Sequence, residues 1–190
     1  MIGRIVLTGG PGAGKTQVSA KIAAAYADRV VVVPEAATQV YSLLRTRWDL
    51  LDTAQQRRAQ KQIYALQCEQ ENRISQQHPD KILLMDRGTV DGATYWPDGP
   101  EAYWEELGTS LKSELARYDL VIWLQTAAAI GKYNIGPPNT CRFEDAAAAE
   151  VSGAQLAQLW GQHPAFYRVD ARNNFQDKIA AVKAIIENVL

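Results

Sequence analysis

The chain has 190 residues, of which 47% are hydrophobic and 22% are charged. These values are ordinary for one folded globular domain and argue against a disordered chain. The formal net charge is −1, so there is no overall basic field, and this argues against a nucleic acid partner.

Cysteine usage and hydropathy predict a cytoplasmic protein. Cys68 and Cys141 lie far apart without metal-ligand spacing, so we expect two reduced thiols. The N-terminal residues run directly into an apolar strand pattern and lack the features of a signal peptide. No apolar run approaches the roughly 18 residues that a membrane span needs, so we expect no membrane segment.

The first half of the chain alternates predicted strands with predicted helices. Short β-branched runs at Arg4–Thr8 and Val30–Val33 are apolar on both faces, which is typical of buried parallel strands. Apolar residues at helical spacing follow the first run from Lys15 onward, and a second helix is expected over Ala36–Leu44. A long polar helix with a capping residue at its start is predicted over 52–77.

The second half continues the alternation. In chain order we expect a strand at 82–86, a short helix from Pro100, a strand at Leu120–Leu124, a loop rich in Gly, Pro and Asn at 131–140, a helix at 145–160, a strand at Phe166–Val169 and a helix at 175–190. Strands that alternate with helices predict a parallel sheet covered on both faces. We therefore expect one α/β domain over 1–190, with three layers in the order α/β/α and about five parallel strands.

A phosphate-binding motif follows the first predicted strand. Its residues are Gly9, Gly10, Pro11, Gly12, Ala13, Gly14, Lys15 and Thr16, which match the Walker A pattern G-x-x-x-x-G-K-[ST] of P-loop NTPases. The glycines let backbone N–H groups surround an anion, and the next helix directs its positive dipole end at the same point. The motif predicts a nucleoside triphosphate whose β- and γ-phosphates contact Lys15, with Mg²⁺ bound by Thr16.

Two carboxylates are predicted at the carboxyl ends of neighbouring strands. Asp86 ends the third strand and Glu35 follows the second. Ligands of open parallel sheets bind at this edge, where a carboxylate can hold Mg²⁺ or accept a proton from an attacking hydroxyl. We assign Asp86 to the metal site and either Asp86 or Glu35 to the catalytic base. The alternatives are a capping role for Asp86 and a solvated or salt-bridged surface position for Glu35.

Two arginines are candidates for binding phosphate or acceptor oxygens. Arg87 directly follows Asp86, and its planar guanidinium suits such oxygens; the alternative is a structural ion pair with Glu35 or Asp86. Arg142 follows the Gly/Pro/Asn-rich loop, and we expect a mobile lid at about 131–145 that brings its charge to the departing phosphoryl group. The alternative for Arg142 is an exposed residue at the start of a helix.

Aromatic residues gather between Asp86 and the fourth strand. They are Tyr95, Trp96, Tyr103 and Trp104. Flat rings there could stack on an acceptor ring, but we interpret at least three of the four as ordinary packing. A set of arginines on the preceding segments could bind an anionic acceptor or form a solvated helix face; it comprises Arg45, Arg47, Arg57 and Arg58.

These motifs resemble those of a known family. The chain resembles the small P-loop ATPase/kinase-like proteins that group with the nucleoside kinase domain of the bifunctional NAD-biosynthesis regulators, and more distantly the deoxynucleoside and thymidylate kinases. The resemblance rests on residues 7–16, on Val33-Pro34-Glu35-Ala36, on Asp86-Arg87-Gly88 with Asp91 and Tyr95, on Tyr118-Asp119-Leu120-Val121, and on Arg142-Phe143-Glu144-Asp145.

The resemblance implies roles for the candidate residues. Asp86 and Arg87 would face the acceptor, Glu35 would act near the acceptor hydroxyl, and Arg142 would contact the donor phosphates. Near the end of the chain the sequence departs from the family pattern. Trp160 and His163 stand where a tyrosine and a turn glycine are expected, at the base-binding end of the family pattern.

The function predicted from the sequence is transfer of the γ-phosphoryl group of ATP, or of GTP, to a small acceptor such as a nucleoside or nucleotide, with Mg²⁺. One alternative is a regulatory NTPase module that acts through a protein partner. Another is a kinase of polynucleotide 5′ ends. An aromatic cluster lining an open cleft would favour the first hypothesis, an exposed aromatic patch the second, and a basic groove leading to Arg87 the third.

Overall fold

The computed structural model describes residues 3–133 and 144–188. Within them, five parallel strands form one sheet in the order β2-β3-β1-β4-β5. The strands are β1 (Arg4–Thr8), β2 (Val30–Val33), β3 (Ile82–Asp86), β4 (Leu120–Leu124) and β5 (Phe166–Val169). In the sheet, β2 and β3 lie on one side of β1, and β4 and β5 lie on the other. Because all five strands are parallel, the loops after β1, β3 and β4 lie at the same edge of the sheet, where open sheets bind ligands.

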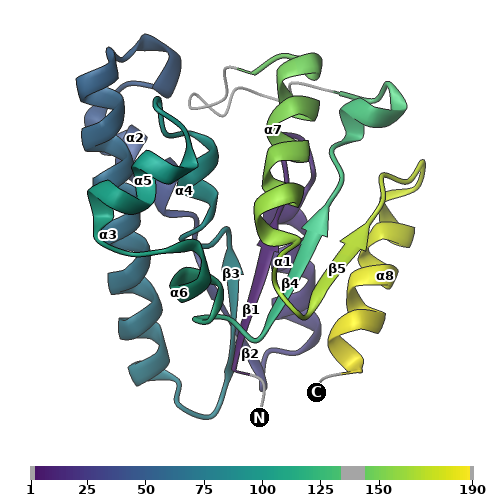
Figure 1. Ribbon diagram of the computed structural model, residues 1–190. Coiled ribbons are helices and arrows are strands. Elements are labelled where there is room, and N and C mark those ends of the chain that lie inside the picture. Colours follow the sequence, from purple (N-terminus) through teal and green to yellow (C-terminus); the bar gives the residue numbers. More distant parts are fainter. Residues whose placement is uncertain (1–2, 134–143, 189–190) are drawn as a thin grey trace.

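Helices connect successive strands and cover the sheet (Figure 1). They are α1 (Lys15–Ala25), α2 (Ala36–Leu44), η1 (Trp48–Leu50), α3 (Thr53–Gln77), α4 (Asp91–Thr94), α5 (Pro100–Leu107), α6 (Leu111–Leu115), η2 (Ala127–Ile130), α7 (Ala146–Trp160) and α8 (Phe175–Glu187). None of the helices in the described residues is long and apolar enough to cross a lipid bilayer.

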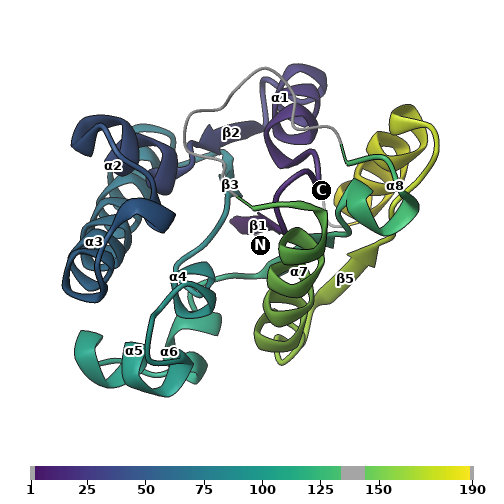
Figure 2. The same cartoon turned by 90° about the horizontal axis from the view of Figure 1, so that it is seen from above.

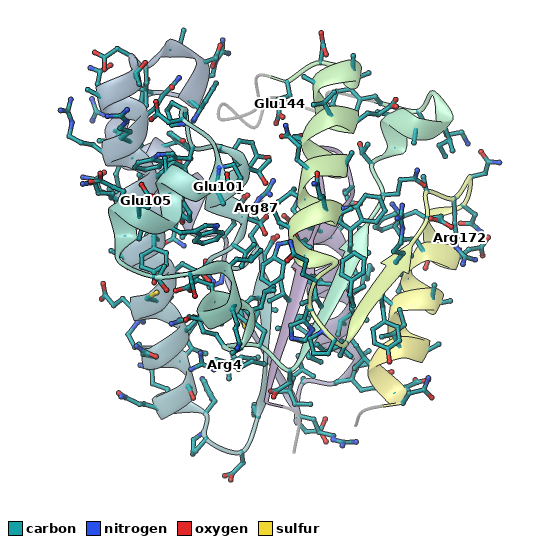
Figure 3. All side chains as sticks on the ribbon, in the orientation of Figure 1. Arg4, Arg87, Glu101, Glu105, Glu144 and Arg172 are labelled. Atoms are coloured by element: carbon teal, nitrogen blue, oxygen red, sulfur yellow. The ribbon has the colours of Figure 1, made fainter. Side chains whose placement is uncertain are left out.

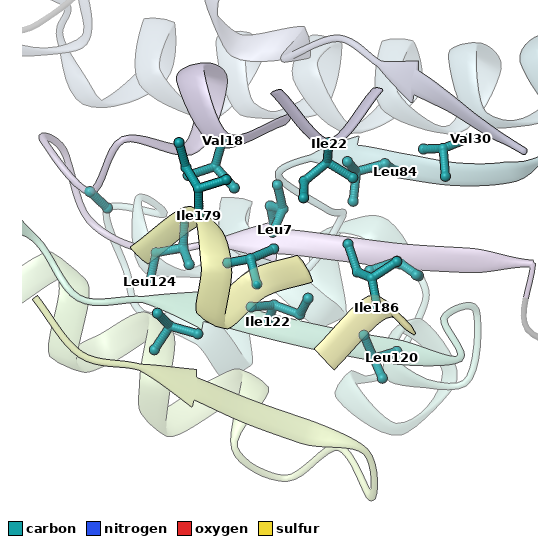
Figure 4. Close-up of a cluster of buried hydrophobic side chains, with 14 residues drawn as sticks. Leu7, Val18, Ile22, Val30, Leu84, Leu120, Ile122, Leu124, Ile179 and Ile186 are labelled. Atoms are coloured by element: carbon teal, nitrogen blue, oxygen red, sulfur yellow. The ribbon is translucent and has the colours of Figure 1, made fainter. Parts of the chain in front are cut away.

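The sheet separates two apolar layers because successive side chains of a strand point to opposite faces. On one face, α1 and α8 pack against β1 and β4 through residues such as Ile22, Ile186, Leu7 and Ile122 (Figure 4). On the other face, α3, α6 and α7 cover the alternate strand positions, with Trp160 fully buried. Viewed from above, α1 and α8 lie on one side of the strands, and α3 and α7 lie on the other (Figure 2).

The predicted three-layer α/β/α fold with five parallel strands is confirmed. The short helices α4 and α6 were not predicted, since four or five residues are too few to show helical periodicity. The long polar helix has the predicted start, where Asp52 and Gln55 form a capping box. Most of the predicted lid, including Arg142, falls outside the described residues, as does Cys141.

Candidate active site

The predicted phosphate loop joins β1 to α1 at the carboxyl edge of the sheet. Gly14 has a φ of 84°, a conformation that L side chains rarely adopt, and a Cβ there would lie 2.8 Å from the ring of Phe175. A Cβ at Gly10 would lie 2.4 Å from the carbonyl oxygen of Ala149 in α7. The loop is therefore glycine-rich both because of its backbone conformation and because α7 and α8 pack closely against it.

Three successive carbonyl groups of the loop accept hydrogen bonds from the segment after β4 and from α8. The pairs are Pro11 O with Thr126 Oγ1 at 2.6 Å, Gly12 O with the Ala127 amide at 3.4 Å, and Ala13 O with Lys178 Nζ at 3.1 Å. The C=O and N–H of a trans peptide point in opposite directions, so these bonds fix the orientation of the peptide N–H groups that follow, of which the Ala13 amide donates back to Gly10 O at 3.2 Å. Amides directed at one point, at the N-terminus of a helix, form an anion site.

Lys15 is the first residue of α1 and is buried within the loop. Its ammonium donates hydrogen bonds to the carbonyl oxygens of Gly9 at 2.8 Å and Gly10 at 3.2 Å. Burial, followed by the charge of Arg87, lowers the pKa of Lys15 to about 8 despite the nearby carboxylates. Triphosphate oxygens would favour the charged form, so this lysine is suited to bind them.

Asp86 and Thr16 meet at the end of β3. The Thr16 hydroxyl donates to Asp86 Oδ2 at 2.8 Å. The other carboxylate oxygen, Oδ1, is buried and has no hydrogen-bond partner among the residues that the structure describes. Burial and the charge of Glu35 raise the pKa of Asp86. A buried oxygen without a partner, beside a hydroxyl and a phosphate loop, fits an oxygen-ligated cation such as Mg²⁺.

The described residues contain no group of three or more His, Cys, Asp or Glu side chains that could hold a metal on their own. Mg²⁺ usually takes one or two protein oxygens together with water and substrate phosphates, and Thr16 and Asp86 could supply such oxygens.

Arg87 and Glu35 form an ion pair beside the phosphate loop. Arg87 Nε donates to Glu35 Oε1 at 2.6 Å, and the Thr38 hydroxyl donates to Glu35 Oε2 at 2.6 Å. Burial alone would raise the pKa of Glu35, but the charges of Arg87 and Lys15 outweigh it and hold the pKa below its usual value. Glu35 is thus an ionised carboxylate at neutral pH. The structural ion pair predicted as an alternative for Arg87 is present with Glu35.

Asp91 fixes the other side of the Arg87 guanidinium. Arg87 Nη1 donates to Asp91 Oδ2 at 2.7 Å, and the backbone of Arg87 has a φ of 75°, a costly conformation for a residue other than glycine. Asp91 Oδ1 in turn accepts from the Thr8 hydroxyl at 2.9 Å and from Trp160 Nε1 at 2.7 Å. Figure 3 shows Arg87 between the α3–α5 side of the molecule and α7. The Arg87 guanidinium is thus held by Glu35 and Asp91, and Asp91 is itself held by Thr8 in β1 and Trp160 in α7.

Trp160 contacts Asp91, the partner of Arg87, and does not form a base-binding end. Its ring is fully buried, and a Cβ at Gly88 would lie 2.8 Å from it. His163 is also buried, and its ring nitrogen lies 2.9 Å from the carbonyl oxygen of Tyr118. Neither side chain lines the large cavity, so the family position that was expected to hold a tyrosine has a packing role in this chain.

A cavity of about 510 Å³ joins the phosphate loop to the ion pair of Glu35 and Arg87. On the side of α2 and α3 its walls include Tyr41, Trp48, Gln60, Tyr64, Gln67 and Tyr95. On the side of β4, β5 and α8 its walls include Ala127, Ile130, Lys132, Arg172, Phe175 and Lys178. The volume and the mixture of aromatic and polar groups are typical of small-molecule sites, with room on both sides of the loop.

The predicted aromatic residues divide between packing and the cavity. Trp96 and Tyr103 are buried together, and Trp104 packs against them. Tyr95 and Tyr103 both line the cavity, and Arg87 lies 5.8 Å from the Tyr95 ring centroid. The cluster forms no exposed patch. The predicted arginine set does not reach the cavity either: Arg47 pairs with Asp49, and Arg57 pairs with Asp98, both near the surface.

Sequence reasoning missed the residues that support the loop from behind. Thr126, Lys178 and Phe175 lie more than 100 residues away from the loop that they contact. No local pattern marks them, because they meet the loop only when the carboxyl ends of β1, β4 and β5 come together. Arg142, predicted to act on the donor phosphates, lies outside the described residues.

Comparisons with known proteins agree with this fold. Two solved structures of a deoxyadenosine kinase from M. mycoides have the same fold, one with products dCMP and dCDP and one with bound dATP. The first is 14% identical, covers 97% of this chain and 99% of that chain, and has a TM-score of 0.64. The second is 17% identical, covers 98% and 100%, and has a TM-score of 0.63. No curated protein matches the sequence significantly.

Sequence identities this low establish the fold and not the substrate. The family model described as "AAA domain" matches residues 4–178, which include every strand, the phosphate loop and Asp86. With the parallel sheet, the loop and the fold of the deoxyadenosine kinase, this match identifies the chain as a member of the AAA domain family with a P-loop kinase-like fold.

Proposed function

We propose that this protein is a phosphotransferase that moves the γ-phosphoryl group of ATP, or of GTP, to a small hydroxyl-bearing acceptor such as a nucleoside or nucleotide. The observation that carries the proposal is the cavity, which brings the phosphate loop and the Glu35–Arg87 pair to one space. A triphosphate held at the loop would direct its terminal phosphate at an acceptor beside Glu35. The proposal places the donor base toward β5 and α8, and the acceptor toward α2 and α3.

In the proposed reaction, Lys15 and the loop amides hold the β- and γ-phosphates. Mg²⁺ at Thr16 and Asp86 would neutralise charge on the phosphate oxygens. Glu35 accepts the proton of the acceptor hydroxyl. The hydroxyl oxygen forms a bond to the γ-phosphorus while the bond between the γ-phosphorus and the bridging oxygen of the β-phosphate breaks. Glu35 is favoured over Asp86 as the base because it is ionised and lines the cavity, whereas Asp86 is buried against Thr16.

Arg87 is proposed to orient the acceptor, or the phosphoryl group during its transfer. Its guanidinium is fixed by two carboxylates and lines the cavity, so little entropy is lost when it binds an oxygen. Arg142 is proposed to neutralise charge on the departing diphosphate. We favour a small acceptor over a protein partner, because the aromatic cluster forms no exposed patch at which a protein could dock.

The test is a panel of nucleosides, nucleotides and small alcohols, with ADP formation measured against the rate without acceptor. We expect slow hydrolysis alone and a marked increase with the right acceptor, and we expect Asp86→Asn to remove most of the increase while binding of Mg·ATP survives better. If no member of a broad panel stimulates the rate and a protein partner does, the regulatory alternative is the better account.

A further inference from the structure

Lys178 is a buried cation that contacts the back of the phosphate loop. It is the fourth residue of α8 and is 4% exposed. Its Nζ donates to the carbonyl oxygen of Ala13 at 3.1 Å and to that of Gln125 at 2.8 Å. Among the described residues it has no carboxylate in salt-bridge contact, and its pKa is lowered to about 8 by burial alone.

Packing does not explain a lysine at this position. Buried lysines are normally paired with a carboxylate, because removing an ammonium from water is costly. The other inward residues of α8 are Ile179, Val182 and Ile186, which join the apolar layer between this helix and the sheet. An apolar residue at 178 would avoid the cost of burying a charge but would leave the carbonyl oxygens of Ala13 and Gln125 without this donor. The lysine is thus directed at the neighbouring loop and not at the apolar layer, which points to a role at that loop.

The geometry shows what the ammonium does to the loop. It links Ala13 in the loop to Gln125 at the end of β4. Gln125 is itself anchored to β5, since its amide donates to Val169 O at 2.9 Å and its side-chain oxygen accepts from the Ala171 amide at 2.9 Å. The Ala13 carbonyl is thus tied to a rigid part of the sheet edge.

The consequence falls on the next amide. The Ala13 carbonyl and the Gly14 N–H belong to one planar peptide and point in opposite directions. Gly14 adopts a φ of 84°, and glycine allows the Ala13–Gly14 peptide to rotate unless the Ala13 carbonyl is held. Lys178 holds that carbonyl away from the hollow, so the Gly14 amide faces the place where phosphates bind.

We propose that Lys178 is a positioning residue for the phosphate loop, which orients the Ala13–Gly14 peptide and places an uncompensated positive charge behind the bound polyphosphate. This inference rests on the proposed binding of a nucleoside triphosphate. Lys178 also lines the cavity on the side proposed for the donor. It acts through the loop and, by its charge, on an anion at the loop; the chemical step itself passes through Glu35.

The test compares Lys178→Met with Lys178→Gln, and uses Lys183→Met in the same helix as the matched control. Lys183 is part-buried and does not line the cavity. Binding of Mg·ATP is measured by calorimetric titration, and thermal unfolding is measured for each variant. We expect Lys178→Met to weaken binding about tenfold, in line with the loss of charge-assisted hydrogen bonds. Lys178→Gln, which keeps an N–H donor without the charge, should fall between Met and wild type, and Lys183→Met should match wild type.

Thermal unfolding separates positioning from a structural role. Methionine removes the cost of burying an ammonium but leaves the carbonyl oxygens of Ala13 and Gln125 without this donor, so the unfolding midpoint of Lys178→Met should stay close to that of wild type although binding is weaker. A lower midpoint with unchanged affinity would show that the lysine only stabilises the fold, and the inference would be wrong. The two proposals also fail differently: wild-type protein that does not bind Mg·ATP contradicts the proposed function, whereas equal binding by wild type and Lys178→Met contradicts only this inference.

Discussion

Replacing Asp91 with asparagine tests whether Arg87 is held by a buried ion pair. Asparagine has nearly the same shape, and its oxygen can still accept from Thr8 and Trp160. The lost element is the negative charge of Oδ2, which accepts from Arg87 Nη1 at 2.7 Å. In its place a side-chain N–H₂ would face the guanidinium, so that two donors oppose each other.

The size of the effect follows from burial. The side chains of Arg87 and Asp91 are 14% and 6% exposed, and removing one partner of such a pair typically costs about 3–5 kcal/mol. Glu35 still compensates part of the arginine charge, so we expect the low end, about 3 kcal/mol. For a chain of this length that corresponds to a fall of roughly 6–12 °C in the unfolding midpoint.

The assay is urea and thermal unfolding of Asp91→Asn beside Asp98→Asn. Asp98 also pairs with an arginine, but the side chains of Arg57 and Asp98 are 45% and 40% exposed. An exposed pair contributes about 0–1 kcal/mol, so the control should be nearly neutral. If the two variants lose similar stability, the ion pair does not hold Arg87 as described.

Three further predictions concern the nucleotide side of the site. Lys15→Ala should weaken Mg·ATP binding by roughly 10- to 100-fold with an unchanged unfolding midpoint, because a charge-assisted contact to phosphate contributes about 1.5–3 kcal/mol; calorimetric titration measures this, and unchanged affinity would rule out the phosphate-loop assignment. Arg142→Ala should lower kcat more than it weakens ATP binding, since a lid charge acts mainly in the transition state; equal losses in kcat and affinity would indicate a plain binding residue. Burial lowers the pKa of Lys178 from 10.5 to about 8, so between these values the folded protein binds fewer protons than the unfolded chain. The free energy of unfolding of wild type should therefore rise with pH from about 8 to 10 relative to Lys178→Met, as read from urea titrations; a constant difference would contradict the lowered pKa.

The sequence predicted the fold and the phosphate loop because both depend on local patterns. Short apolar runs marked the strands, such as the valine run closed by Pro34 and the run that ends at Asp86, and the Walker A residues need only their neighbours in sequence to be recognised. The supports of the loop could not be predicted. Lys178 contacts Ala13 across 165 residues, and Trp160 contacts Asp91 across 69. Such contacts are set by the order of the strands and not by any spacing along the chain.

Arg87 illustrates the limit for single residues. Its position after Asp86 predicted both an acceptor contact and an ion pair, and the choice depended on which carboxylates the fold would bring near it. The structure places Glu35 and Asp91 there and leaves the guanidinium on the cavity wall. The ion pair and a role toward the acceptor are thus compatible, which residue types alone could not reveal.

Transfer of a labelled γ-phosphate tests the central claim most directly. Wild-type protein and Lys15→Ala are incubated with γ-labelled ATP, Mg²⁺ and the acceptor that most stimulates ADP formation, and the products are separated. The account predicts that wild type moves the label onto the acceptor hydroxyl in step with ADP formation, and that Lys15→Ala does not. Label found only in inorganic phosphate, at a rate that no acceptor changes, would contradict it.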